Sequence, residues 1–297
     1  MYNFLVSEIL KKGEEMNQHL LKKRWVQTVC IILAVSISIP LIIRAGIDIV
    51  AATYKVWTPD YDLVDISSVL DKESLTDEDY DLLYEQTGLT KVGIDDMLAR
   101  GMKNEILRIQ QEFFAEPAFV CSKFHFCVGM FEKKRGTYRH APLQEGDVIY
   151  SPSTYISFIN ISHTAIAVDG GNWVVEAYGY GNPTQYNSAA TFFIYPEFVI
   201  LRPKAEYGGA EIGAAAAEYV EENMLDVPYD ILTGIFGDKA PDELKTTHCS
   251  HLPWYAYYQV GLDVDSNGGK IVTPKDILNS PYFEVVQVFG MDIEDYR

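Results

Sequence analysis

Positive charge is scarce in this sequence. Its 297 residues include 24 Lys and Arg against 42 Asp and Glu, and the formal net charge is −18 at pH 7. A surface that binds nucleic-acid phosphates needs a basic patch. The shortage of Lys and Arg therefore argues against nucleic acid as a partner. Hydrophobic residues make up 48% of the chain, so we expect a packed core.

Metal-ligand patterns are also missing. The densest group of candidate ligands is His248, Cys249 and His251, in "TTHCSHLPW". Structural zinc sites use spaced pairs such as C-x₂₋₄-C with H-x₃₋₅-H. The sequence contains no second pair of that kind, so we expect neither a metal nor another cofactor.

Cysteine is rare, with four in the whole chain. Cys30 lies in an apolar stretch and is expected to be inert. Cys121 and Cys127, in "CSKFHFC", are close enough to close a small disulfide loop in an oxidising compartment. Cys249 is then the unpaired thiol. It is either a nucleophile or an ordinary buried cysteine.

Charge is absent from "WVQTVCIILAVSISIPLII" at 25–43, a stretch long enough to span a bilayer core as a helix. Lys and Arg are more frequent before this stretch than after it, which places the N-terminus in the cytoplasm and residues from about 50 onward outside. We interpret 1–24 as a cytoplasmic basic N-terminus and 25–43 as a transmembrane signal anchor. The alternative is a signal peptide cleaved at "VAA" (50–52).

The chain after residue 43 divides into regions of different composition. Residues 44–73 are interpreted as a connector and 74–142 as a helical accessory region, whose first helix has a capping signal at Thr76 and ends at Gly88. From 143 to 297, runs of Val, Ile, Phe and Tyr between turn residues predict strands. Strands are expected at 147–151, 163–169, 173–178, 198–202 and 283–289, and helices at about 209–224, from near Cys249, and at 273–278. The predicted fold class is α+β, a mainly antiparallel sheet packed on helices.

The clearest hairpin signal is "ISHTAIAVDGGNWVVEAYG" at 161–179. If Gly170 and Gly171 form the turn, His163 and Glu176 are diagonal neighbours on one face, with Cα atoms roughly 7–8 Å apart. A slip of one residue would put Glu176 on the other face. A carboxylate beside an imidazole fixes its tautomer and supports its protonated form. The alternative is a strand-end His and a half-exposed Glu with no mutual role.

Pro253 constrains the helix that carries the cysteine. Proline is tolerated in the first turn of a helix but not in its interior. The helix is therefore expected to start around Cys249, with Thr247 or His248 near the cap. A cysteine at a helix N-terminus has its thiolate stabilised by the helix dipole and by free N–H groups.

The order "GDVIYS … SHTAIAVDGGNWVVEA … PYD … CSHLPWYAYY … TPKDI" resembles the circularly permuted papain-fold cysteine hydrolases of the NlpC type, in particular the YiiX/YebB-like branch. In that branch the His-bearing hairpin precedes the Cys-bearing helix, as it does here. The resemblance covers about residues 143–290. It implies a permuted papain-like domain over 143–297, preceded by the helical block and one transmembrane helix.

The resemblance also implies roles for individual residues. Cys249 matches the nucleophile, His163 the base, and Glu176 the polar third member on the neighbouring strand. Candidate contacts to substrate or oxyanion are Tyr229, in "PYD", and also Ser250 and His251. His251 and Pro253 depart from the residues common in the family, which puts the shape of the pocket and the activity itself in question.

These inferences predict a cysteine hydrolase anchored in a bacterial cell membrane, with its catalytic domain outside. Its substrate would be a peptide or acyl compound with an amide or ester bond, and a cell-wall peptide of peptidoglycan is the leading candidate. One alternative is a lipid acyltransferase or thioesterase resembling the LRAT group. Another is a non-catalytic surface interaction protein that keeps the same fold.

Overall fold

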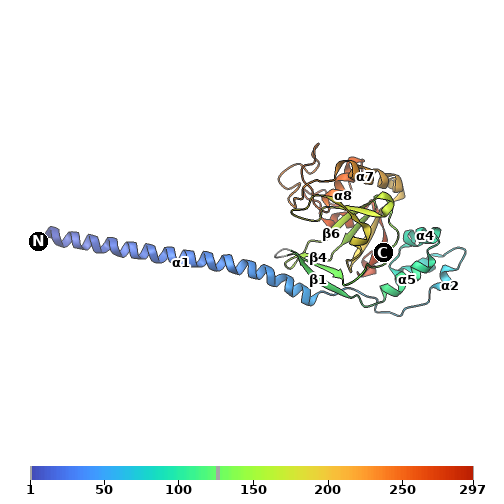
Figure 1. The fold of residues 1–297 in the computed structure, drawn as a ribbon, viewed down its shortest axis with the longest axis horizontal. Coiled ribbons are helices and arrows are strands. Elements are labelled where there is room, and N and C mark those ends of the chain that lie inside the picture. The colour runs from blue at the N-terminus through green and yellow to red at the C-terminus, as the bar shows by residue number, and fades with distance from the viewer. Residues whose placement is uncertain (1, 125–127, 297) are drawn as a thin grey trace.

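The computed structural model describes residues 2–124 and 128–296. Its most prominent element is α1 (Tyr2–Thr53), a helix of 52 residues that projects away from the rest of the molecule (Figure 1). At 1.5 Å per residue it is about 78 Å long. Residues His19–Thr53 form a helix long and apolar enough to cross a membrane. The predicted span at 25–43 lies inside it.

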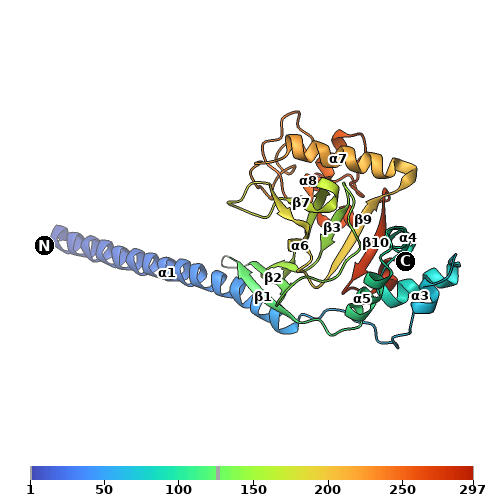
Figure 2. The ribbon, with the colours of Figure 1, turned by 45° about the vertical axis from the view of Figure 1, so that its right-hand side comes forward.

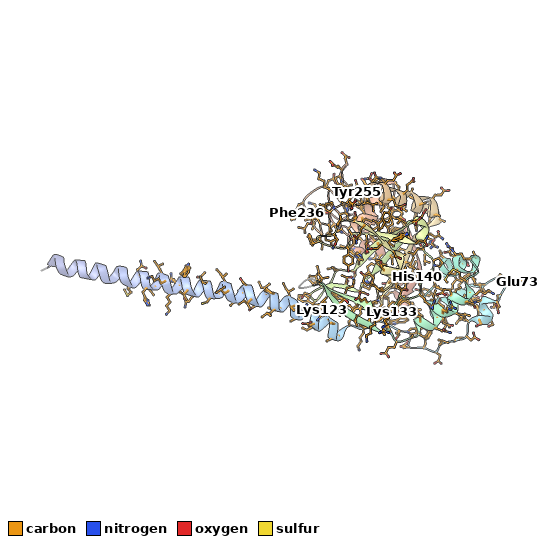
Figure 3. All side chains as sticks on the ribbon, viewed as in Figure 1. Glu73, Lys123, Lys133, His140, Phe236 and Tyr255 are labelled. Carbon is orange, nitrogen blue, oxygen red and sulfur yellow. The ribbon has the colours of Figure 1, made fainter. Side chains whose placement is uncertain are left out.

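The C-terminal end of α1 packs against the folded domain. Ile47 is fully buried and lies against Gly129. Tyr54 stacks on Phe131, with ring centroids 3.5 Å apart. Lys123, labelled near this junction in Figure 3, forms an ion pair with Asp48 of α1. The predicted connector at 44–73 is therefore helical up to Thr53, because Ile47 and Tyr54 have a surface to pack on.

The helical block consists of α3 (Asp77–Thr87), α4 (Lys91–Ala99) and α5 (Lys103–Phe113), and the short α2 (Ser67–Leu70) precedes it. The predicted capping at Thr76 is confirmed as a capping box with Asp79, and Gly88 ends α3 with a φ of 68°. Buried residues of the block belong to the same hydrophobic cluster as the main sheet. The block thus shares a core with the domain that follows it.

The prediction of a helical region over 74–142 was wrong after α5. β1 (Phe119–Phe124) and β2 (Val128–Lys133) pair as an antiparallel hairpin. They form a small sheet of order β1-β2-β4-β5 with β4 (Thr154–Ile156) and β5 (Ile159–Asn160). These strands are short, and their apolar residues have a buried face only because α1 packs against the small sheet. Cys127 lies outside the described residues, and so does the predicted Cys121–Cys127 disulfide.

The main sheet has six strands in the order β10-β9-β3-β6-β7-β8, and its pairs are antiparallel (Figure 2). The strands are β3 (Val148–Ser151), β6 (His163–Val168), β7 (Trp173–Glu176), β8 (Gln185–Ser188), β9 (Phe198–Pro203) and β10 (Phe283–Phe289). Every residue of β3, β6 and β9 is buried, so the centre of the sheet is covered on both faces. The α+β class is confirmed.

Two helices cover one face of the main sheet. α7 (Gly209–Asn223) and α8 (His251–Gln259) pack against each other and against β6. The short helices α6 (Ala189–Phe192) and α9 (Pro274–Leu278) complete the domain, and α9, predicted at 273–278, has Thr273 as its cap and Pro274 at its first position. The packing of α8 on β6 is what brings the cysteine helix to the histidine strand.

Candidate active site

The hairpin register places His163 beside Glu176. Ile166 pairs with Val175, and Val168 with Trp173, which is the predicted register. The turn is a 3₁₀ segment, Asp169–Gly171, rather than a two-residue turn, but the parity is the same. The Nε2–H of His163 donates to Glu176 Oε2 at 2.6 Å. The predicted diagonal contact is therefore present.

A second residue holds Glu176 from its other side. Asn187 Nδ2 donates to Glu176 Oε1. Asn187 lies on β8, where Gln185 is the direct partner of Glu176, so Asn187 is a diagonal neighbour of the carboxylate. Sequence reasoning missed Asn187 because it did not predict β8. The diagonal rule that paired His163 with Glu176 would have found it once "QYNS" was assigned to a strand.

Aromatic rings restrict the imidazole. His163 is only 6% exposed and stacks on Phe192, with ring centroids 5.6 Å apart and planes 14° apart. Tyr178 and Tyr195 contact the ring at its edge or at an angle. Because Nε2 is engaged with Glu176, Nδ1 is the nitrogen available to Cys249. The ring is thus held in one orientation by stacking on one side and a carboxylate on the other.

Cys249 lies just before the first turn of α8. The helix begins at His251 with Ser250 as its N-cap, two residues later than the predicted start. Pro253 is then the third helical residue, where its missing N–H removes no intrahelical bond. Thr164 Oγ1 donates to the carbonyl of Cys249 at 2.7 Å. This bond ties the cysteine to β6 at the residue next to His163.

The electrostatics of the site favour an ion pair. Burial alone would raise the pKa of Cys249, but interactions with the rings of His163 and His248 lower the pKa to about 5. Burial disfavours a charged His163, but its hydrogen bonds to Cys249 and Glu176 raise its pKa to about 10. Between these two values the pair is a thiolate and an imidazolium.

His248 contributes more than the sequence suggested. From the sequence it is expected near the cap of the cysteine helix. Its Nδ1 accepts from the His251 N–H at 3.3 Å, which assigns the ring proton to Nε2. That Nε2 is buried and has no hydrogen-bond partner among the described residues. His248 nevertheless lowers the pKa of Cys249, and both residues line the second cavity.

The other residues predicted to contact substrate or oxyanion are Tyr229, Ser250 and His251, and their settings differ. Tyr229 lines the cavities on both sides of Cys249 and stacks edgewise on Tyr180. The hydroxyl of Ser250 donates to the carbonyl of Val272 at 2.8 Å. Both ring nitrogens of His251 are engaged, with Thr247 at 2.9 Å and the Lys239 carbonyl at 2.8 Å, and burial lowers its pKa to about 4. The polar side-chain atoms of Ser250 and His251 are thus engaged within the protein, and of these two residues only Ser250 lines one of the cavities.

Two cavities meet at the sulfur. The first, of about 220 Å³, is lined by residues of β2 and β4, by His163 and by the segment after β7. The second, of about 380 Å³, lies between Cys249, His248 and the segment that leads into α9. Cys249 is partly exposed and borders both. A substrate can therefore lie across the nucleophile, with one group in each cavity.

No group of three or more His, Cys, Asp or Glu side chains is arranged to hold a metal ion in the part of the chain that the structure describes. No protein-family model, curated protein or solved structure matches this chain. The resemblance to the permuted papain-fold hydrolases therefore depends on the residues and their order alone.

Glu176→Gln tests whether the carboxylate acts through His163. The substitution keeps the shape of the side chain but removes the negative charge that stabilises the His163 imidazolium. A smaller fraction of Cys249 is then present as thiolate. We expect kcat/KM for an activated ester such as p-nitrophenyl acetate to fall by about 10²-fold or more, with the acid limb of the pH profile moving to higher pH. Glu197→Gln is the control, because that carboxylate is buried against Tyr54 and Ser153. Activity within twofold of wild type and an unmoved acid limb would show that Glu176 has no such role.

Proposed function

We propose that this protein is a membrane-anchored cysteine hydrolase that cleaves an amide, ester or thioester through an acyl-enzyme on Cys249. One arrangement carries the proposal: Cys249 and the buried His163 border one cavity, their interaction lowers the pKa of the thiol, and the His163 Nε2–H donates to Glu176 Oε2 at 2.6 Å. This is the order nucleophile, base and orienting group that activates a cysteine.

The mechanism follows from the ion pair. The Cys249 thiolate attacks the carbonyl carbon, and the carbonyl oxygen becomes an oxyanion. His163 gives its proton to the leaving group as the bond to the carbonyl carbon breaks. Water then attacks the thioester, His163 takes a proton from that water, and the acid departs as the thiolate re-forms. Glu176 and Asn187 hold the ring through both steps.

The oxyanion needs donors close to the sulfur. The main-chain N–H of Cys249, at the start of α8, is one candidate. The phenol of Tyr229 is another, since it borders both cavities beside Cys249. Burial raises the pKa of Tyr229 above its ordinary value, so its hydroxyl keeps its proton at neutral pH. We assign both as donors to the oxyanion.

The geometry favours an enzyme over a non-catalytic surface protein. A cysteine buried only for packing has its pKa raised and has no need of a charged partner. Here two histidine rings lower the pKa of Cys249. A buried imidazole and carboxylate are costly to desolvate unless they are paired. Such a group beside a cavity is typical of a catalytic site.

Two further parts of the proposal have separate support. The permuted papain-like fold is supported by the chain order, since β6 with His163 precedes α8 with Cys249, and by the packing of α8 on β6. Anchoring in a bacterial cell membrane with the domain outside is supported by the apolar helix at His19–Thr53 and by the excess of Lys and Arg before 25–43.

Trapping the covalent intermediate tests the proposal. Full-length protein in detergent micelles is mixed with p-nitrophenyl acetate, quenched in acid and analysed by intact mass and peptide mapping. We expect a burst of p-nitrophenol close to one per protein and a single acetyl group on Cys249. If acetyl groups are found only on lysines, or on Cys121 as readily as on Cys249, the protein is not a cysteine hydrolase of this kind.

A further inference from the structure

The first cavity beside Cys249 has an apolar wall. Its aliphatic lining residues are Val128, Met130, Ile156, Ile161, Ala177 and Ile231, and four tyrosines complete much of the rest. Apart from the Cys249–His163 pair, none of the described lining residues carries a formal charge. An apolar cavity of roughly 150 Å³ holds benzene. At about 220 Å³ this one has room for part of an alkyl chain.

One wall of this cavity continues to the anchor helix. Ile156 lines the cavity from β4, and two residues later the β4–β5 turn presents Phe158 and Ile159, which are 65% and 56% exposed. Phe158 lies beside Gly46 of α1. The predicted membrane span ends at residue 43, about 5 Å along the helix from Gly46. The turn therefore lies at the level where α1 would leave the bilayer.

A second exposed aromatic lies on the same side of the domain. Phe236 is 85% exposed and occupies the edge of the domain on the side from which α1 projects (Figure 3). Ile49 of α1 is also exposed, which extends the apolar surface of the helix past the predicted span. The exposed Phe158 beside Gly46 of α1 and the exposed Ile49 on α1 itself are typical of membrane-facing surfaces.

We infer that the substrate is a long-chain acyl ester of a membrane lipid, and that its acyl chain enters the first cavity over the β4–β5 turn. This inference rests on the proposed function of Cys249. In the first step a Cys249 S–C bond forms, the ester C–O bond breaks, and the proton from His163 goes to the lipid alcohol. In the second step water supplies oxygen to the acyl carbon, and a free fatty acid leaves.

The lining argues against a charged peptide in this cavity. A carboxylate or ammonium buried there would need an oppositely charged partner. The formal charge of −18 also disfavours close approach to an anionic lipid surface, so a zwitterionic lipid is the expected source of the chain. The leaving group would lie in the second cavity, which borders Cys249 from its other side and is lined in part by polar residues such as Thr273 and Lys275.

The test uses full-length protein in proteoliposomes of dioleoyl phosphatidylcholine and dioleoyl phosphatidylethanolamine. We expect free oleate to accumulate and an oleoyl group to be recovered on Cys249 after an acid quench, with neither in Cys249→Ala.

Soluble cell-wall muropeptides and p-nitrophenyl acetate are assayed in parallel. Acetylation of Cys249 without oleate release would overturn the lipid inference and leave the hydrolase proposal intact. Cleavage of muropeptides in place of lipid would do the same. Failure of all three substrates would overturn both.

Variants of the cavity wall test the route of the chain. Ile156→Gln and Ile161→Gln each place a polar amide in the cavity. We expect either to lower the ratio of p-nitrophenyl octanoate to acetate hydrolysis by about tenfold. Phe158→Ser with Ile159→Ser should lower oleate release from vesicles by about tenfold. Leu63→Ser is the matched control, because Leu63 is exposed and lies outside the cavity. Unchanged ratios and unchanged vesicle rates would overturn the assignment of this cavity to the acyl chain.

Discussion

Cys249→Ala is expected to lower the hydrolysis of p-nitrophenyl acetate by roughly 10⁴- to 10⁶-fold, to the rate of the buffer. The effect is this large because the sulfur forms the bond that divides one difficult step into two easier ones. The neighbouring hydroxyl of Ser250 does not replace the thiol, because it donates to the carbonyl of Val272. The measurement is steady-state kcat/KM with the burst amplitude.

The matched control is Cys121→Ala. Cys121 is a partly buried thiol on β1, and burial raises its pKa. It therefore offers little thiolate at neutral pH, and its removal should leave kcat/KM within twofold of wild type. If activity survives in Cys249→Ala but is lost in Cys121→Ala, the nucleophile is Cys121 and its assignment to Cys249 is wrong.

The largest expected effect on stability comes from Asp147→Ala. Asp147 is fully buried just before β3, and its two carboxylate oxygens accept from Arg202 at 2.9 and 2.7 Å. Removing Asp147 leaves the buried Arg202 charge with only its longer ion pair to Asp96, at 3.4 Å. We therefore expect the free energy of unfolding to fall by about 3–5 kcal/mol. Urea unfolding of the full-length protein in detergent micelles, followed by tryptophan fluorescence, measures the change.

Asp71→Ala provides the comparison for that stability change. Asp71 and Lys103 form an exposed pair at 2.8 Å, and such pairs contribute about 0–1 kcal/mol. The two variants remove the same chemical group from a buried and an exposed setting. Equal losses for both would contradict the structural importance of the Asp147–Arg202 pair.

Local patterns predicted much of this fold because each depends on few residues. The "DGGN" segment limits how β6 and β7 can pair, and a change of one residue would turn buried side chains outward. Thr76 and Gly88 define α3 through capping bonds within the same helix. Pro253 limits the start of α8 to within one turn. In each case the determining contact lies within a few residues of the element.

Other features depend on contacts that sequence spacing does not contain. The hairpin of β1 and β2 becomes buried only when α1 docks, through Ile47 and Tyr54. Asn187 reaches Glu176 only because β8 adds to the edge of β7. The sequence places His248 near a helix cap, whereas the structure places it in the wall of the second cavity beside Cys249. These are tertiary effects, which local periodicity does not predict.

The candidate site combines both kinds of information. The contact between His163 and Glu176 follows from the parity of one hairpin, so the sequence predicts it. The approach of Cys249, 86 positions away, depends on the packing of α8 and on the bond from Thr164 to the Cys249 carbonyl. Only the resemblance in chain order suggested that pairing before the geometry was available.

The most direct test of the account is the pH dependence of Cys249 alkylation by iodoacetamide in wild type and His163→Ala. We expect a midpoint near the lowered pKa of about 5 in wild type. In His163→Ala we expect a midpoint at or above the ordinary thiol value of about 8.5. At pH 6.5 this lowers the alkylation rate by about 10²-fold, and His248→Leu should move the midpoint upward by less. A wild-type midpoint near 8.5 that His163→Ala leaves in place would contradict the central claim.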